Sequence, residues 1–197
     1  EGNGNTGGTD PADQTKTHGV DLTLSDQGTL VKTGHTFSGW NTAADGSGTA
    51  YAAGGTYSAE EGATLYAQWT ADTYTVTYDG NGFTGGSAPS NQTKTHGVDL
   101  TLSDRGTLVR TGYTFVEWNT ASDGSGTSYA ESASYTNNAN LDLFAIWTAD
   151  TYTITFEGNG NTGGTDPADQ TKTYGVDLTL SDQGTLVKAG YTFSGWN

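Results

Sequence analysis

Hydrophobic and polar residues alternate strictly over Thr73–Tyr78 (TYTVTY), with tyrosines and a valine on one face and threonines on the other. The same alternation returns over Tyr152–Phe156 (YTITF). A period of two residues is that of a β-strand, and β-branched and aromatic side chains favour strands. Both stretches are therefore predicted to be half-buried antiparallel strands.

Three more stretches complete the pattern within one unit. Thr95–Leu102 is predicted to be a second strand, and Leu141–Trp147 to be the closing strand. Phe144 and Ile146 face away from the other apolar positions of the closing strand, so we expect that strand to be covered on both faces. Gly106–Arg110 is either one helical turn or an extended connection, because it is too short for an independent helix.

The aromatic residues before Asn119 do not fit a regular strand. Tyr113 and Phe115 have the same parity, which Trp118 breaks. One face cannot bury all three side chains unless an extra residue is inserted, so a β-bulge is predicted near Glu117. Glycine stands at the equivalent positions of the other copies, as bulges allow, namely Gly39 and Gly195.

The whole pattern repeats with a period of 78 residues. Glu1–Asn41 returns as Glu157–Asn197, and Asp79–Asn119 is a more divergent copy of the same segment. The first and third copies differ at three positions, where His18, Thr33 and His35 are replaced by Tyr174, Ala189 and Tyr191. A fixed period of this kind is typical of tandem arrays.

The period predicts three modules with boundaries after Asp72 and Asp150. Residues 1–72 form a module without its first strand, residues 73–150 a complete module, and residues 151–197 the N-terminal part of a third. Only Thr-Ala-Asp-Thr separates Trp69 from Tyr74, and again Trp147 from Tyr152, so the linkers leave little freedom. Neighbouring modules are therefore expected partners, and open sheet edges predict head-to-tail pairing of copies by strand addition.

Composition narrows the function. The formal net charge is −15, with 22 acidic and seven basic residues, which argues against nucleic acid and anionic membrane surfaces. There is no cysteine, hence no disulfide, thiolate metal site or thiol nucleophile. No apolar run approaches the roughly 20 residues needed to span a bilayer, so no direct membrane insertion is expected in this segment.

Aromatic residues are 11% of a chain that is only 32% hydrophobic, so they are expected to form most of the core. An alternative is that the tryptophans form a platform for stacking sugars. The predicted structural core consists of Trp40, Trp69, Tyr74, Val76, Tyr78, Tyr113, Phe115, Trp118, Leu143, Trp147, Tyr152, Phe156 and Trp196.

Several residue patterns suggest chemistry, but each has a simpler reading. The glycines of DGNGFTGG (Gly80, Gly82, Gly85) resemble a phosphate-binding loop, yet no helix or P-loop lysine follows, so a turn is predicted. The three histidines, His18, His35 and His96, suggest a metal site, but tyrosine replaces them in the third copy, and half-exposed strand aromatics are the better reading. A Ser-His-Asp set is arithmetically available without the spatial roles that define a triad. No catalytic residue, metal site or cofactor is assigned.

Two further readings stay open. Asp45 and Asp123 lie in DGSG turns, where Ala121–Ser128 is predicted to be a hairpin. Each could join a calcium site, although calcium requires six to eight oxygen ligands. Lys94, equivalent to Lys16 and Lys172, lies near Asn91 and Asp99 in the sequence and could form an amide crosslink, but a solvated strand lysine is the simpler interpretation.

The segments YTVTYDGNG, GYTFVEWNT, DGSGT and LFAIW, in this order, resemble the Listeria–Bacteroides repeat family, which includes internalin B-repeats. The resemblance covers the whole chain. It implies a mainly β protein built of tandem small β-grasp-like modules with little or no helix, located outside the cell on a bacterial surface. It supplies no catalytic residues.

The resulting expectation is a non-enzymatic structural and adhesive segment of a large cell-surface or filament protein. It would act as a stiff spacer with weak multivalent contacts. The alternative is a dedicated module that binds host or matrix glycans or glycoproteins through ligand-binding residues that the sequence does not identify.

Overall fold

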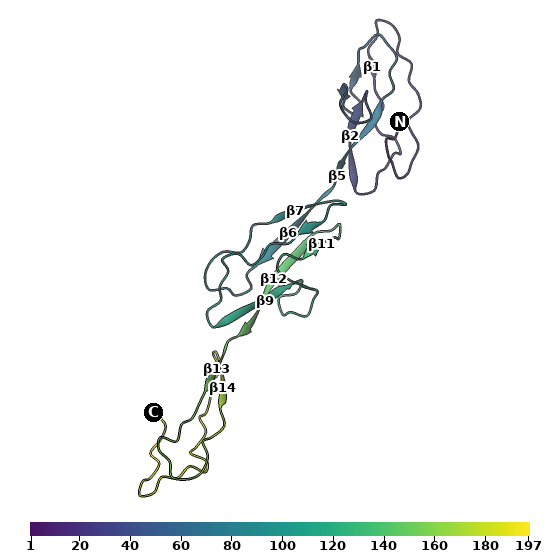
Figure 1. Ribbon diagram of the computed structural model, residues 1–197. Helices are drawn as coiled ribbons and strands as arrows, with labels where there is room; N and C mark the ends of the chain where they lie inside the picture. Colours follow the sequence, from purple (N-terminus) through teal and green to yellow (C-terminus); the bar gives the residue numbers. More distant parts are fainter. The chain divides into compact units, whose positions relative to one another are not determined.

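The computed structural model describes residues 1–197 and contains strands β1 to β14 and no helix (Figure 1). The predicted mainly β class is confirmed. Thr73–Tyr78 is a strand, which extends to Asp79 as β6, and the predicted closing strand extends to Ala149 as β12. Along β6 the buried side chains are Val76 and Tyr78, as the alternation predicts.

The strands form five small sheets. One has the order β3 (Ala50–Tyr51), β2 (His35–Asn41), β5 (Tyr66–Ala71). Another has the order β10 (Ser128–Tyr129), β9 (Tyr113–Asn119), β12 (Leu141–Ala149), β6 (Thr73–Asp79), β7 (Gln92–Thr95). The remaining sheets are pairs: β1 (Leu22–Thr23) with β4 (Thr56–Tyr57), β8 (Leu100–Thr101) with β11 (Ser134–Tyr135), and β13 (Thr151–Ile154) with β14 (Gln170–Thr173).

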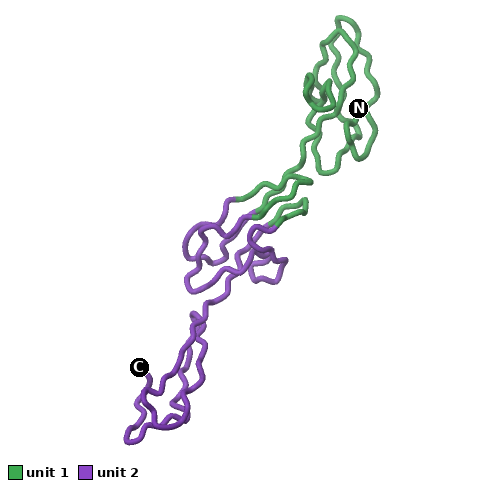
Figure 2. Tube along the Cα trace, in the orientation of Figure 1, with its two compact units in different colours: residues 1–76, 91–102, 134–141 green, residues 77–90, 103–133, 142–197 purple.

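The chain divides into two compact units (Figure 2). The first contains residues 1–76, 91–102 and 134–141, and the second contains residues 77–90, 103–133 and 142–197. Each unit thus includes one of the two linkers between repeats. The repeat boundaries after Asp72 and Asp150 stay predictions from the sequence.

The predicted bulge is confirmed. Ile146 pairs with Glu117 and the next residue, Trp147, pairs with Phe115, so Val116 is the extra residue on β9. The shift brings the rings of Phe115 and Trp118 into edge-to-face contact, with centroids 5.3 Å apart. Trp118 is fully buried as a result. β2 has the same irregularity in the first repeat, between Phe37 and Gly39.

The predicted strand Thr95–Leu102 is wrong. β7 ends at Thr95 and β8 begins at Leu100, and between them the backbone turns at Gly97, whose φ is +73°. The amide of Val98 donates to the carbonyl of Thr95, which closes the turn and leaves the Val98 side chain 59% exposed. The alternation of apolar and polar residues was misleading here, because glycine readily adopts a positive φ and so interrupts the strand.

The structure also tests the predictions for two short segments. Gly106–Arg110 is not helical: a turn at Gly106 precedes an extended segment in which Val109 bridges Gly85. The hairpin over Ala121–Ser128 is confirmed, because Asn119 on β9 pairs with Ser128 on β10.

Most of the expected core residues lie inside. Seven are buried, namely Trp40, Val76, Tyr78, Phe115, Trp118, Leu143 and Phe156. Five are half-buried, namely Trp69, Tyr74, Tyr113, Trp147 and Trp196. The exception is Tyr152, which is 50% exposed, because β13 pairs only with β14 and no strand lies along its other side. Buried leucines that the sequence analysis did not name complete the core, namely Leu24, Leu30, Leu102 and Leu108.

Replacing Trp118 with alanine is expected to destabilise the second repeat by about 3–5 kcal/mol, because a fully buried ring is lost and a cavity remains. Native-state hydrogen exchange at the β9 and β12 amides measures the free energy of unfolding of this repeat. Val116→Ala is the control, since this neighbouring side chain is 51% exposed and its loss is expected to cost under about 0.5 kcal/mol. Equal costs for the two variants would contradict the packing described above.

Candidate functional site

The first linker is held by hydrogen bonds on both sides of one residue, Asp72. Its amide donates to the carbonyl of Gly34 at 2.9 Å, in the first repeat. Its carbonyl accepts the amide of His96 at 2.8 Å, in the second repeat. The Thr36 hydroxyl also donates to the Asp72 carboxylate at 2.9 Å. Because β5 ends at Ala71 and β6 begins at Thr73, Asp72 is the only residue between the strands.

The second linker repeats this arrangement in the other compact unit. The amide of Asp150 donates to the carbonyl of Gly112 at 2.9 Å, and its carbonyl accepts the amide of Tyr174 at 2.8 Å. The Thr114 hydroxyl donates to the Asp150 carboxylate at 2.7 Å. The same three hydrogen bonds therefore connect neighbouring repeats at both linkers, and we call each arrangement a junction.

A ring from the following repeat covers each junction glycine. The φ of Gly34 is +67°, and a Cβ there would lie 2.1 Å from the His96 ring. Gly112 has a φ of +73°, and its Cβ would lie 2.3 Å from the Tyr174 ring. Glycine is thus required both by the backbone conformation and by the close approach of the ring.

The residues of the two junctions were not predicted from the sequence. Of the three histidines predicted to be half-exposed strand aromatics, only His35 lies half-buried on a strand, β2. The prediction is wrong for His18, which is exposed in a turn, and for the position of His96, which is half-buried in the turn after β7. The contact between His35 and His96 was not predicted. Their rings make edge-to-face contact across the first junction, with centroids 5.8 Å apart. Tyr113 and Tyr174 make the same contact at 5.7 Å across the second. A signal was present, since both ring positions change between histidine and tyrosine among the copies.

Lys94, which lies on β7, contacts other residues than the sequence suggested. Lys94 is 1% exposed, and its Nζ donates to the Thr95 carbonyl at 2.9 Å and to the Asn138 Oδ1 at 3.1 Å. Asn91 and Asp99, which lie closer in the sequence, are not among these contacts. The Asn138 Oδ1 also accepts the amide of Gly97 at 2.9 Å. Lys94 is therefore a buried strand residue that helps to fix the adjoining turn, and the expectation of a solvated side chain is wrong.

In the first repeat a carboxylate replaces that amide oxygen. The Lys16 Nζ lies 2.9 Å from the Glu60 Oε1, and the His18 Nδ1 lies 2.9 Å from the Glu60 Oε2. The amide of Gly19 donates to the same carboxylate. The hydrogen bond from Lys16, followed by that from Gly19, lowers the pKa of Glu60 below its usual value.

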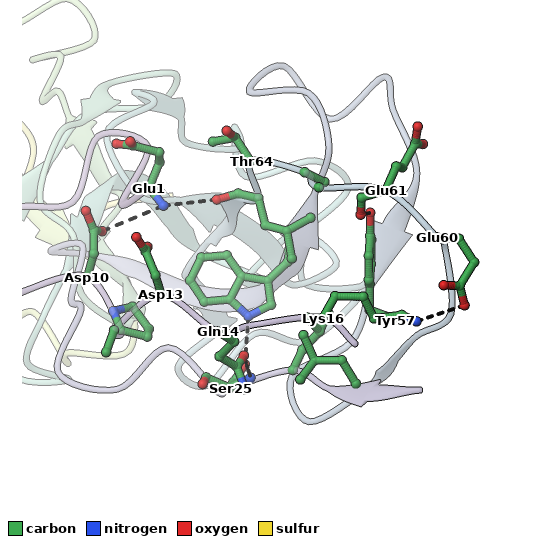
Figure 3. Close-up of a pocket in the computed structure, with 18 of the residues that line it drawn as sticks. Glu1, Asp10, Asp13, Gln14, Lys16, Ser25, Tyr57, Glu60, Glu61 and Thr64 are labelled. Atoms are coloured by element: carbon green, nitrogen blue, oxygen red, sulfur yellow. Dashed lines mark hydrogen bonds and ion pairs between the residues drawn. The ribbon is translucent and has the colours of Figure 1, made fainter. Parts of the chain in front are cut away.

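A groove of about 780 Å³ in the first repeat is lined by side chains that include Trp40, Tyr57, Leu65, Lys16 and Glu60 (Figure 3). In the second repeat the corresponding tryptophan, Trp118, is covered by the ring of Tyr78 from β6, with centroids 4.9 Å apart. The residues of the first repeat include no counterpart of β6.

The DGSG aspartates serve their own turns. The Asp45 Oδ1 accepts the amide and hydroxyl of Ser47 at 3.0 and 2.7 Å. Asp123 accepts the same groups of Ser125 at 3.0 and 2.6 Å. The serine hydroxyl, followed by the serine amide, lowers the pKa of each carboxylate. No group of three or more His, Cys, Asp or Glu side chains is arranged to hold a metal ion.

The glycine-rich turn after β6 is also structural. Asn81 has a φ of +46°, and its side-chain amide donates to the carbonyls of Ser122 at 2.7 Å and Ala145 at 2.9 Å. These bonds attach the turn to the hairpin and to β12. No helix N-terminus follows that could bind phosphate.

Every tryptophan indole is used within the protein. Each Nε1 donates to a backbone carbonyl at 2.8 to 3.0 Å, and the pairs are Trp40 with Ser25, Trp69 with Gly2, Trp118 with Ser103, Trp147 with Gly80 and Trp196 with Ser181. Buried or half-buried rings with bonded indoles present little surface for stacking a sugar. The tryptophans therefore serve the core and its loops.

Gly34→Ala is expected to weaken the first junction by about 1–3 kcal/mol, through backbone strain and displacement of the His96 ring. Gly54→Ala is the matched control: Gly54 is in the same repeat with a φ of +66°, and its Cβ would meet nothing within 4 Å. Hydrogen exchange at the Asp72 and His96 amides reports the junction. If the Asp72 and His96 amides exchange no faster in Gly34→Ala than in Gly54→Ala, the ring contact does not contribute to the stability of the junction.

The Glu60 contacts are expected to stabilise the first repeat at neutral pH and to be lost on acidification. A carboxyl whose pKa is lower in the folded chain stabilises it above the unfolded pKa, and the contribution disappears as pH falls through the folded pKa. An NMR titration of the Glu60 carboxyl should give a midpoint below its usual 4.5. In Lys16→Met the midpoint should return toward that value, and a midpoint indifferent to this change would refute the contact.

No helix of the protein has the length and apolar character needed to cross a membrane. No solved structure matches the chain. Its similarity to known proteins is therefore a similarity of sequence.

Two relatives come from Evansella cellulosilytica. The chain is 36% identical over 197 aligned residues to a protein with the provisional name of a Gly-rich membrane protein, an alignment that covers 94% of this chain and 22% of the relative. It is 41% identical over 88 residues to a second protein, provisionally named a membrane protein, covering 44% of this chain and 13% of that protein. The chain thus spans less than a quarter of the length of either relative.

The Listeria–Bacteroides repeat domain matches the chain three times, at residues 2–68, 74–146 and 152–197. The matches leave only short gaps, and the gaps contain the two junction aspartates, Asp72 and Asp150. The chain therefore belongs to the Listeria–Bacteroides repeat domain family.

Proposed function

We propose that this chain is a non-enzymatic spacer segment of a bacterial surface protein, in which neighbouring repeats are held in a defined relation by their junctions. The observation that carries the proposal is the recurrence of the same three hydrogen bonds at Asp72 and Asp150. A flexible tether would leave the linker backbone to water. Here both the N–H and the C=O of each linker aspartate are bonded to protein, one to each adjoining repeat.

The linker composition supports this role. Glycine, serine and proline, which set the flexibility or reach of ordinary linkers, are absent between the strands. Each linker consists of one aspartate between β-branched or small residues of the flanking strands. A short linker with a bonded backbone restricts the angles available to its neighbours.

The net charge of the chain and the names of its relatives support a position on the outside of the cell. A net charge of −15 favours solubility and repels anionic surfaces. The relatives' provisional names refer to membrane proteins, and repeats of this kind are suited to the part of such a protein that extends outside the cell. The proposed β-grasp-like module agrees with the central position of β12 and β6 in the five-stranded sheet.

Weak adhesive contacts are the second part of the proposal. One valine at the same turn of every repeat is exposed, Val20 at 59%, Val98 at 59% and Val176 at 58%. Linked copies of a weak apolar contact gain avidity through their effective concentration. The alternative, a dedicated glycan-binding module, has less support because the tryptophan indoles are bonded internally.

The spacer function is tested by the distance distribution between two spin labels, one on each side of the first linker. The chain has no cysteine, so Ala53→Cys and Asn137→Cys, both at exposed positions, can be labelled alone. We expect a narrow distribution for this pair. Inserting Gly-Ser-Gly-Ser after Asp72 separates the two halves of the junction and should broaden it.

The insertion serves as the reference for a free linker. If the uninserted chain already gives a distribution as broad as the inserted one, the junction does not restrain the repeats and the spacer function is refuted. Circular dichroism of both proteins must agree, which confirms that the insertion leaves the repeats folded.

A further inference from the structure

The two junctions share their backbone bonds but differ in their rings. The first brings together His35 and His96, and the second brings together Tyr113 and Tyr174. Both pairs are edge-to-face, at 5.8 and 5.7 Å, so the geometry is nearly the same. The chain therefore contains two versions of one contact that differ in the chemistry of the rings.

Only one version contains side chains of a type that ordinarily changes its charge near neutral pH. Histidine is the side chain whose ordinary titration falls between pH 5 and 8. Tyrosine remains neutral throughout that range, because phenols ionise near pH 10. Acidification therefore acts on the ring pair of the first junction and not on that of the second.

Each histidine ring has a hydrogen-bond partner in the protein, and neither partner carries a negative charge that would neutralise a protonated ring. The His35 Nδ1 lies 3.0 Å from the Thr33 carbonyl, which can only accept, so this nitrogen carries the hydrogen and a further proton would bind at Nε2. The His96 Nδ1 lies 3.1 Å from the Tyr74 hydroxyl. Neither ring forms an ion pair with a carboxylate, unlike His18, which is paired with Glu60.

Two charged residues belong to the first junction, Asp72 and Lys32, and the backbone carbonyl of each accepts the amide of one of the two histidines. Asp72 is the linker carboxylate, and its Oδ1 is already bonded to the Thr36 hydroxyl. Lys32 precedes the junction glycine and its carbonyl accepts the amide of His35. Lys32 is the counterpart of Arg110, whose guanidinium lies 4.1 Å from the centre of the Tyr113 ring. That cation attracts a neutral tyrosine ring but would repel an imidazolium.

We propose that the junction between the first and second repeats is pH-responsive: protonation of both His35 and His96 loosens it, while the tyrosine junction between the second and third repeats stays closed. One charged ring can be accommodated beside a neutral one. Protonation of the second ring places two positive charges on rings whose centroids are 5.8 Å apart, and neither ring has a carboxylate in an ion pair that would offset them.

The loosening has a specific structural consequence. The His96 ring covers Gly34, and the amide of His96 donates to the carbonyl of Asp72. Displacement of the ring therefore exposes the bonds that restrain the linker. An array with histidine at some junctions and tyrosine at others would become flexible at chosen points in mildly acidic surroundings.

Amide hydrogen exchange of the intact chain tests this within one molecule. The amides of Asp72 and His96 report the first junction, and those of Asp150 and Tyr174 report the second. Protection factors, corrected for intrinsic exchange, are compared at pH 7.5 and pH 5.0, where most carboxylates keep their charge. Protection at the first junction is expected to fall about tenfold relative to the second, which is the effect of two unit charges about 6 Å apart at a partly exposed site.

Exchanged ring pairs provide the controls. His35→Tyr with His96→Tyr should give the first junction the pH-indifferent protection of the second. Tyr113→His with Tyr174→His should confer the response on the second junction. The inference is overturned if the two junctions respond alike in the unmodified chain, or if the response persists without the histidines. Absence of protection at both junctions at pH 7.5 would instead refute the spacer function as well.

Discussion

A single residue separates the last strand of one repeat from the first strand of the next, and its backbone cannot be left unbonded between two packed sheets. A buried or half-buried N–H or C=O without a partner is costly. Asp72 and Asp150 meet this constraint by donating to the glycine carbonyl behind them and accepting the amide of the ring residue ahead. Two repeats therefore meet closely at one aspartate. This close approach requires a residue with positive φ and no Cβ, and the ring of the next repeat covers that glycine.

Within each repeat, a small helix-free sheet has to be covered by side chains and loops. The chain does this with aromatic rings in edge-to-face contact, an arrangement that favours ring pairs beyond the area they bury. The bulge on β9 brings Phe115 and Trp118 together, and β6 adds Tyr78. Each indole then donates to a loop carbonyl, so the same side chain fills the core and fixes the loop above it. No buried side-chain nitrogen or oxygen lacks a hydrogen-bond partner.

Local patterns in the sequence predicted much of this fold. Alternation located β6 and β12, a break in parity located the bulge, and Asp-Gly located the hairpin, because each depends on neighbouring residues alone. Thr95–Leu102 failed because Gly97 can leave the strand conformation without cost to a side chain. The pairing of Lys94 with Asn138, and of His35 with His96, could not be predicted from local pattern, since both join residues from separate strands and loops. The comparison of the first and third copies contained one indication of the junction, because histidine is replaced by tyrosine at both ring positions.

That change also indicates where such an array can vary. The first and third copies differ at 18, 33 and 35 of the first repeat and nowhere else over the shared 41 residues. Thr33 and His35 flank the junction glycine, and position 18 corresponds to His96 and Tyr174, each of which covers the junction glycine of the preceding repeat. Replacing Thr33 by Ala189 keeps the backbone contact, because both amides donate to a threonine hydroxyl oxygen, that of Thr6 at 2.9 Å and that of Thr162 at 2.9 Å. Core and turn positions are held by packing and by backbone geometry within a repeat, whereas the ring at a junction needs only a partner of suitable shape. The ring pair can therefore change from one junction to the next while the backbone bonds of the junction stay the same.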